Sequence, residues 1–204
     1  MQVRKTESKG DMRRRQVVDA AAECFRREGF HGTSIAQISR AAGMSPGHIY
    51  HYFANKESIV EAIVEQEESD FAELLQLLNE ERGSGDFLDA LSRQVDTIVD
   101  RILDPQRVAL TLEIAAEAAR NPKIANLLQE SDRRMAQQFA GLAGALGEVA
   151  VAQIDDPASR TRLEMLPLLF SGLTLRSVYN PGVDRPLITR MIKQTLVALW
   201  RHSA

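Results

Sequence analysis

Residues 32–58 read Gly-Thr-Ser-Ile-Ala-Gln-Ile-Ser-Arg-Ala-Ala-Gly-Met-Ser-Pro-Gly-His-Ile-Tyr-His-Tyr-Phe-Ala-Asn-Lys-Glu-Ser, and this stretch decides the fold. Ser34 and Gln37 form a capping-box pattern, which predicts the start of a helix. Gly43 predicts the end of that helix in a left-handed residue. Ser45-Pro46 then predicts the start of a second helix, with a cap and a proline at the first helical position. The stretch therefore predicts two short helices joined by a glycine turn.

The apolar residues of this stretch fall on the inner faces of the two predicted helices and in the turn between them: Ile38, Ala42, Met44, Ile49 and Tyr52. The residues left on the outer face suit hydrogen bonding and charge pairing: Ser45, Gly47, His48, Tyr50, His51, Asn55 and Lys56. A helix-turn-helix of this kind places its second helix in a DNA groove. The sequence thus predicts a surface that reads nucleic acid.

The same residues carry a family resemblance, from Arg13 to about Ile63. They are Gly29-Phe30, Thr33-Ser34-Ile35, Ile38-Ser39, Ala42-Gly43-Met44-Ser45, Gly47, Tyr50, Tyr52-Phe53 and Lys56-Glu57. In this run the chain resembles the N-terminal DNA-binding domain of the TetR/AcrR family of bacterial transcriptional regulators. Ser39 and Tyr52 depart from the family's commonest pattern, which has alanine and histidine there. The resemblance implies three reader helices followed by a helical body of six.

Composition agrees with a globular protein outside the membrane. Of the 204 residues, 44% are hydrophobic and 26% charged, and no apolar run approaches the roughly 20 residues that span a bilayer. The first ten residues lack the apolar segment of a signal peptide. The single cysteine, Cys24, cannot form an internal disulfide, and its apolar neighbours predict a buried structural thiol. We expect a cytoplasmic protein.

Charge is divided along the chain. Residues 1–60 hold ten Lys/Arg and six Asp/Glu, a net charge of +4, whereas residues 61–204 hold 15 and 22, a net charge of -7. Positive charge at one end favours phosphate contact there. The predicted reader is therefore the basic part of the chain.

No strand pattern competes with the helical periodicity, so the sequence predicts an all-α fold of about nine helices. We expect a helix-turn-helix DNA-binding domain over 1–58, with a flexible arm over 1–11, and a helical ligand-binding and dimerisation domain over 59–204. Breaks within the second domain fall at Gly83–Asp86, Asp104-Pro105, Asn121-Pro122 and Tyr179–Gly182.

The last two predicted helices, Asp156–Val178 and Asp184–Trp200, are apolar on more than one face. Such helices need two partners, which predicts a homodimer through this pair, as the family resemblance also implies. A deeply buried hairpin in a monomer is the alternative. Pro167 lies inside the first of these helices and should bend it, either to open space for a ligand or to fit the dimer interface.

Roles in DNA binding follow from side-chain chemistry and from position in the family motif together. Phosphate contacts are expected from Thr33, which is also an alternative helix cap, and from Ser34, Tyr50 and Lys56. Base reading is expected from Pro46, Gly47, His48 and His51 next to the cap Ser45, because imidazoles can donate to guanine or thymine and glycine permits close approach. The alternative for His48 and Tyr50 is a plain surface position.

Signatures of enzymes are missing in the forms that the sequence can test, including the phosphate-binding glycine loop, Gly-x-Ser-x-Gly and His-Glu-x-x-His. We expect no catalytic residues, no cofactor and no metal site. His48 and His51, three residues apart, could in principle bind a metal but lack further ligands, and DNA contact is the better use for them. The candidate ligand-binding residues in the body are Glu113, Glu117, Met135, Phe139, Leu166 and Phe170.

These expectations combine into a homodimeric repressor that a small-molecule inducer releases from a palindromic double-stranded DNA operator. The alternative is a constitutive DNA-binding adapter whose body recruits a protein partner without a ligand. A closed apolar cavity with convergent polar groups would favour the first.

Overall fold

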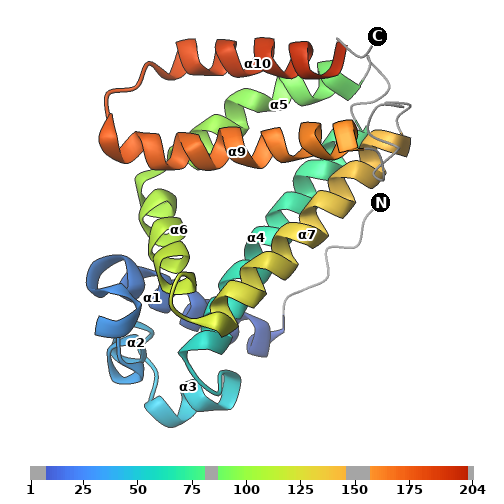
Figure 1. Cartoon of the computed structure of the whole chain (residues 1–204). Helices are drawn as coiled ribbons and strands as arrows, with labels where there is room; N and C mark the ends of the chain where they lie inside the picture. The colour runs from blue at the N-terminus through green and yellow to red at the C-terminus, as the bar shows by residue number, and fades with distance from the viewer. Residues whose placement is uncertain (1–7, 81–86, 146–156, 202–204) are drawn as a thin grey trace. The chain divides into compact units, whose positions relative to one another are not determined.

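The computed structural model describes residues 8–80, 87–145 and 157–201 (Figure 1). Within these ranges the chain forms nine helices and no strand, so the all-α prediction is confirmed. The helices, labelled as in Figure 1, are α1 (Lys9–Gly32), α2 (Ile35–Ala41), α3 (Pro46–Tyr52), α4 (Lys56–Glu80), α5 (Phe87–Ile102), α6 (Pro105–Ala118), α7 (Pro122–Ala145), α9 (Pro157–Tyr179) and α10 (Arg185–Arg201). None of these described helices is long and apolar enough to cross a bilayer. The first seven residues of the predicted arm and the predicted break at 83–86 lie outside the described residues.

Helix boundaries follow the local capping signals. Asp184 accepts a hydrogen bond from the Leu187 N–H at 2.9 Å and so caps α10, as the sequence predicts. The start of α1 differs from the prediction, because Ser8 and Asp11 form a second capping box and the helix begins at Lys9. The assignment of residues 9–11 to a flexible arm is therefore wrong.

The chain divides into two compact units. The first contains the residues up to Glu67 together with Ala109–Gln129, and the second contains Glu68–Val108 and the residues from Glu130 onward. Beside the predicted reader, the first unit thus includes residues 59–67 of α4, most of α6 and the start of α7. The sequence assigns these three segments to the body.

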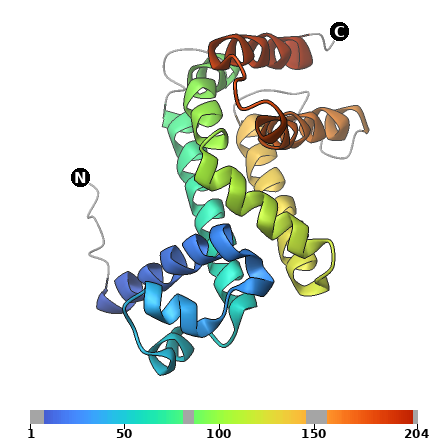
Figure 2. The same cartoon turned by 90° about the vertical axis from the view of Figure 1, so that its left-hand side faces the viewer.

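The first unit is built on a buried core beneath the helix-turn-helix. Helix α1 packs on α2, and α2 packs on α3 (Figure 2). The side chains of Val17, Phe25, Ile38, Ile49 and Ile59 are at most 1% exposed. Cys24 belongs to this core, and burial raises the pKa of its thiol. The predicted structural role of that cysteine agrees with its place.

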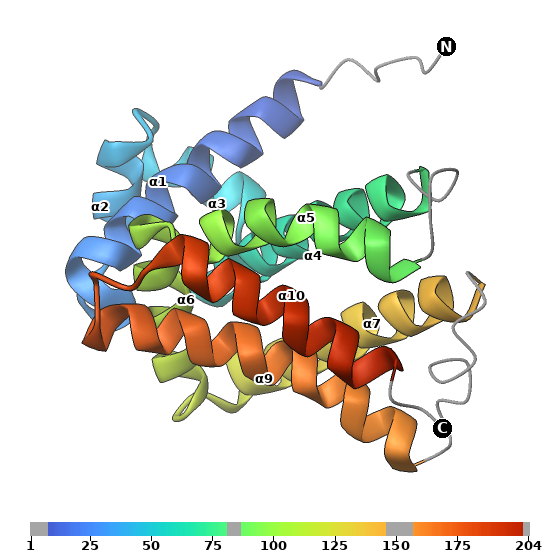
Figure 3. The ribbon, with the colours of Figure 1, turned by 90° about the horizontal axis from the view of Figure 1, so that it is seen from above.

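The second unit has its own core, in which α5 packs against α9 and α10 (Figure 3). Phe87 and Phe139 meet edge to face with ring centroids 5.5 Å apart. The carboxylate of Glu68 accepts hydrogen bonds from the Arg134 guanidinium, which hold its pKa below the usual range.

The outer faces of α9 and α10 are apolar and exposed. Leu168, Leu175, Val178 and Tyr179 on α9, with Leu187 and Met191 on α10, are 46–72% exposed. Leu166, Leu173, Ile192 and Leu196 on the same helices are buried. The predicted two-sided apolar pattern is therefore present.

Pro167 is exposed, as is its neighbour Leu168, and α9 continues past it as one helix. Of the two roles predicted for this proline, its exposure favours the one at the dimer interface over the one in a ligand pocket.

Candidate nucleic-acid interface

The turn between α2 and α3 is fixed by contacts that converge on it. Gly43 has a φ of 62°, as the predicted left-handed residue requires. The Ser39 hydroxyl donates to the Met44 carbonyl, and the Gln16 amide donates to the Ala42 carbonyl at 2.8 Å. Gln16 lies on α1, so the sequence stretch 32–58 alone could not reveal this contact. These two hydrogen bonds and the left-handed Gly43 set the angle at which α3 leaves α2.

Helix α3 presents the predicted reading face to solvent. Ser45 caps it by accepting the His48 N–H at 3.3 Å, and Ile49, with 0% exposure, anchors the inner side. The residues predicted to read bases or contact phosphate from this helix are all exposed: Ser45, Pro46, Gly47, His48, Tyr50 and His51. This short helix can therefore offer two imidazoles and one phenol to an external partner without losing a core contact.

The two imidazoles are not independent. His48 stacks on the Tyr52 ring at a centroid distance of 5.4 Å, and His51 meets the same ring edge-on at 5.1 Å. Tyr52 is half-buried against the core of the first unit. It thus orients both imidazoles, a role that the sequence did not assign. No group of three or more metal-ligating side chains is found among the described residues.

Replacing Gly47 with alanine should affect the stability of the protein and its affinity for the operator in opposite directions. A methyl group there would meet no atom within 4 Å, so the protein itself does not need glycine at this position. Gly47→Ala should keep or raise the free energy of unfolding, by up to about 1 kcal/mol, because alanine favours helix. It should weaken operator binding, because the methyl group would stand between α3 and the groove. Urea unfolding and fluorescence-anisotropy titration measure the two effects, and equal operator affinity would remove Gly47 from the interface.

Two of the predicted phosphate contacts have partners inside the protein instead. Thr33 is 2% exposed and its hydroxyl donates to the Gly29 carbonyl at 2.8 Å. The Lys56 ammonium donates to the Thr33 carbonyl at 2.8 Å and to the Phe30 carbonyl. It also lies 4.4 Å from the centre of the Phe30 ring, and burial lowers its pKa. These groups brace the connector, residues 29–34, which runs from the kink of α1 at Gly29 to the cap of α2. We correct the assignment of Thr33, whose hydroxyl is buried, whereas the phosphate contact of Lys56 stays a prediction.

Ser34, the third such residue, remains exposed at the start of α2. Its hydroxyl accepts the Gln37 N–H at 3.2 Å, and its own N–H donates to the Gln37 side chain at 2.7 Å. The predicted capping box is confirmed. Its phosphate role stays a prediction, as does that of Tyr50, which is 57% exposed.

The salt dependence of DNA binding separates a brace from a phosphate contact at Lys56. Lys56→Met should lower the free energy of unfolding by roughly 1–3 kcal/mol, because two carbonyls lose a charged donor. Operator affinity should fall with it, but the slope of affinity against salt concentration should not change. The loss of one phosphate contact would reduce the slope of log affinity against log salt concentration by roughly 0.9. Such a reduction in Lys56→Met would show that Lys56 contacts the DNA.

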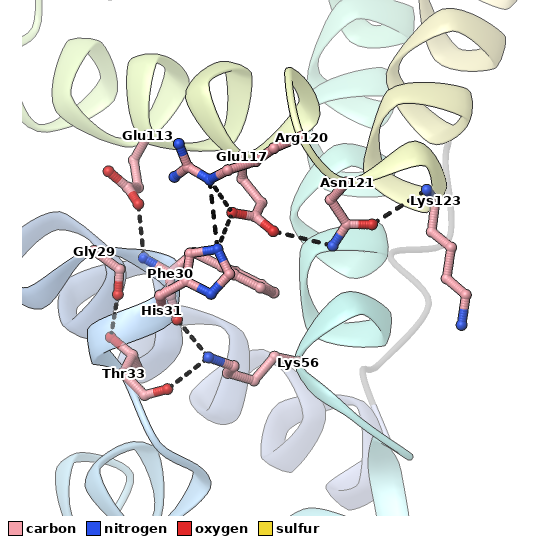
Figure 4. A network of polar contacts seen from close by, with 10 residues as sticks. All are labelled: Gly29, Phe30, His31, Thr33, Lys56, Glu113, Glu117, Arg120, Asn121 and Lys123. Atoms are coloured by element: carbon pink, nitrogen blue, oxygen red, sulfur yellow. Dashed lines mark hydrogen bonds and ion pairs between the residues drawn. The ribbon is translucent and has the colours of Figure 1, made fainter.

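The candidate ligand residues do not share one environment. Glu113 and Glu117 belong to the first unit, where their carboxylates contact α1 (Figure 4). Phe139 and Leu166 lie in the core of the second unit, with Phe170 packed against it and Met135 half-buried. The two glutamates have partners within the protein, and their role in ligand binding stays a prediction. The four remaining residues stay candidates for a ligand site in the second unit.

Comparison with known proteins gives two family matches along the chain. Residues 17–63 match the family model described as bacterial regulatory proteins, tetR family, and residues 88–201 match the BetI-type transcriptional repressor, C-terminal.

Individual relatives give the same result. The regulator UidR of Escherichia coli is 31% identical over 57% of either chain, so the match spans little more than half of that relative. The regulator BetI of Cronobacter sakazakii is 29% identical over 94% of either chain. The solved structure of Salmonella enterica GusR has a TM-score of 0.74 at 26% identity and covers 95% of this chain and 98% of its own.

Proposed function

Because the chain belongs to the TetR family of bacterial regulatory proteins and is a DNA-binding transcriptional regulator, we propose that it is a homodimeric repressor released from its operator by a small molecule. The observation that carries the proposal is the exposed polar face of α3, anchored from beneath by Ile49. The match of residues 88–201 to BetI-type repressors supports repression. The protein acts in the cytoplasm, on bacterial DNA.

Reading of the operator is assigned to α3. His48 and His51 contact base edges in the major groove, and Tyr50 and Ser34 contact phosphates on either side. Two copies of the reader, related by a two-fold axis, bind a pseudo-palindrome whose half-sites lie roughly 34–36 Å apart.

Base reading by His48 has a distinctive signature. His48→Ala should relax the preference at one base pair of each half-site by roughly 1–3 kcal/mol and leave affinity for random DNA unchanged. Titration of the variant against operators with single base-pair changes measures the preference. A uniform loss of affinity on all of these sequences would instead make His48 a backbone contact.

Dimerisation is assigned to the outer faces of α9 and α10. Six large apolar side chains are exposed there, and an apolar patch of this kind marks an interaction surface. A self-complementary patch on two antiparallel helices suits a two-fold interface, in which the same residues meet their copies.

The effector site is assigned to the second unit, near Met135, Phe139, Leu166 and Phe170. Apolar and aromatic side chains are typical walls of small-molecule sites. An effector that binds the DNA-incompatible form more tightly shifts the protein away from the operator.

A ligand screen distinguishes this function from that of a constitutive adapter. Compounds that raise the melting temperature are added to the protein on a labelled operator. Release of DNA at concentrations that raise the melting temperature supports the repressor. Compounds that stabilise the protein without releasing DNA, together with capture of a partner protein by the DNA-bound form, would favour the adapter.

A further inference from the structure

The connector, residues 29–34, which begins at the kink of α1 at Gly29 and ends at the cap of α2, is held from two sides within the first unit (Figure 4). From α6, Glu113 Oε1 accepts the Phe30 N–H at 2.7 Å. From the start of α4, the Lys56 ammonium donates to the carbonyls of Phe30 and Thr33. Both polar groups of the Phe30 backbone are therefore bound by side chains.

Glu117 holds the next residue of the connector. Its side chain is 2% exposed, and its Oε2 lies 2.9 Å from His31 Nε2 and 3.3 Å from Arg120 Nε. Its Oε1 accepts a hydrogen bond from the Asn121 amide at 3.0 Å, whereas Oε2 receives no well-directed hydrogen bond. A buried carboxylate is costly unless charge compensates it. The Arg120 guanidinium compensates this carboxylate and also donates from Nε to His31 Nε2 at 3.4 Å, so Arg120 joins Glu117 to His31.

The geometry of the connector is fitted to these two carboxylates. Glu113 and Glu117 are four residues apart and so lie on one face of α6. Gly29 has a φ of 74°, and a Cβ at this residue would lie 3.1 Å from Glu113 Oε1. Glycine therefore lets the α6 carboxylate reach the Phe30 N–H.

We propose that Glu113 and Glu117 are positioning residues for DNA reading, an inference that rests on the proposed function. They act through the connector, which ends at Ser34, the cap of α2. Helix α2 in turn packs on the recognition helix α3. Glu113 acts as a hydrogen-bond acceptor and Glu117 through its charge. A small displacement of α3 should break contacts with particular bases and so lower the affinity for the operator. The affinity for random DNA depends on the general attraction to phosphates and should change little.

The two roles predict different responses to substitution. Glu113→Gln keeps an acceptor oxygen and should behave as wild type, whereas Glu113→Ala should lower the ratio of operator affinity to random-DNA affinity by about tenfold. Glu117→Gln removes the charge that faces His31 and Arg120 and should lower the ratio to a similar extent. Glu61, exposed on α4 of the same unit, supplies the control, because Glu61→Gln and Glu61→Ala remove the same charge.

The experiment measures two properties of each variant. Anisotropy titrations on a selected operator and on random DNA give the affinity ratio, at a temperature where circular dichroism shows every variant folded. Amide hydrogen exchange reports on residues 30–41 without DNA. We expect the ratio to fall and exchange in this segment to quicken in Glu113→Ala and Glu117→Gln, but not in Glu113→Gln or the Glu61 variants.

The outcomes separate this inference from the proposed function. Wild-type protein that prefers no DNA sequence would overturn the proposed function. Wild-type preference with affinity ratios in Glu113→Ala and Glu117→Gln that match the Glu61 controls would overturn the positioning role alone. A lower melting temperature with an unchanged ratio would also overturn it, because the carboxylates would then serve stability only.

Discussion

Replacing Leu175 with glutamate should convert the protein into a folded monomer that no longer binds its operator specifically. Leu175 is 46% exposed on α9, so the charge does little harm within one chain. At a two-fold interface the carboxylate would be buried twice without a partner, which should raise the dimer dissociation constant by roughly a thousandfold. A monomer contacts one half-site only, so operator affinity should fall by a comparable factor. Sedimentation equilibrium and operator titration measure the two effects.

Leu77 provides a matched control for this experiment. It is a leucine of similar exposure, 48%, on α4 of the same compact unit. Leu77→Glu should leave both the dimer and operator binding intact. Dissociation by Leu77→Glu, or a persistent dimer of Leu175→Glu, would place the interface elsewhere.

Replacing Gly29 with alanine should destabilise the reader by about 1–3 kcal/mol or more. Gly29 has φ 74° and ψ 167°, a backbone region that is essentially restricted to glycine, and other residues are strained there by that amount. The new methyl group would also lie 3.1 Å from Glu113 Oε1, so that the carboxylate must withdraw from the Phe30 N–H. Urea unfolding measures the loss, and it should be accompanied by lower operator affinity.

Gly43 separates strain at Gly29 from a general intolerance of glycine substitution. Its φ of 62° is compatible with the left-handed region that asparagine tolerates. Gly43→Asn should therefore cost less than Gly29→Asn. Equal losses at the two positions would show that backbone strain at Gly29 is not the cause.

The helix-turn-helix was predictable because its signals are local. The caps at Ser34 and Ser45 depend on residues three positions away in the chain, and Gly43 itself marks the turn. The outer face of α3 followed from the same short pattern. The family resemblance added the helical body, which periodicity alone divides into helices but does not assemble.

The contacts of Lys56 and Glu113 could not be predicted in this way. Lys56 hydrogen-bonds Thr33, which lies 23 residues away in the chain, and Glu113 hydrogen-bonds Phe30, which lies 83 residues away. A charged residue on an amphipathic helix is normally solvated, so the pattern suggests an external partner, phosphate or ligand. Only the fold shows that the Thr33 carbonyl lies beside Lys56 and the Phe30 N–H beside Glu113.

The apolar pattern of the last two helices predicts two buried faces but does not say which face packs on the core. The sequence marks many apolar positions on α10 but does not say which of them face the core. In the structure Leu196 is 2% exposed and Met191 is 49% exposed. A charge at Leu196 would therefore unfold the second unit, whereas one at Met191 tests the interface.

Selection of bound sequences from a random double-stranded DNA library tests the central claim most directly. The account predicts enrichment of a pseudo-palindrome whose half-sites are centred about one helical turn apart, and loss of that enrichment in the monomeric Leu175→Glu variant. Recovery of DNA without any enriched sequence, or of a single unpaired site bound equally well by both proteins, would contradict it.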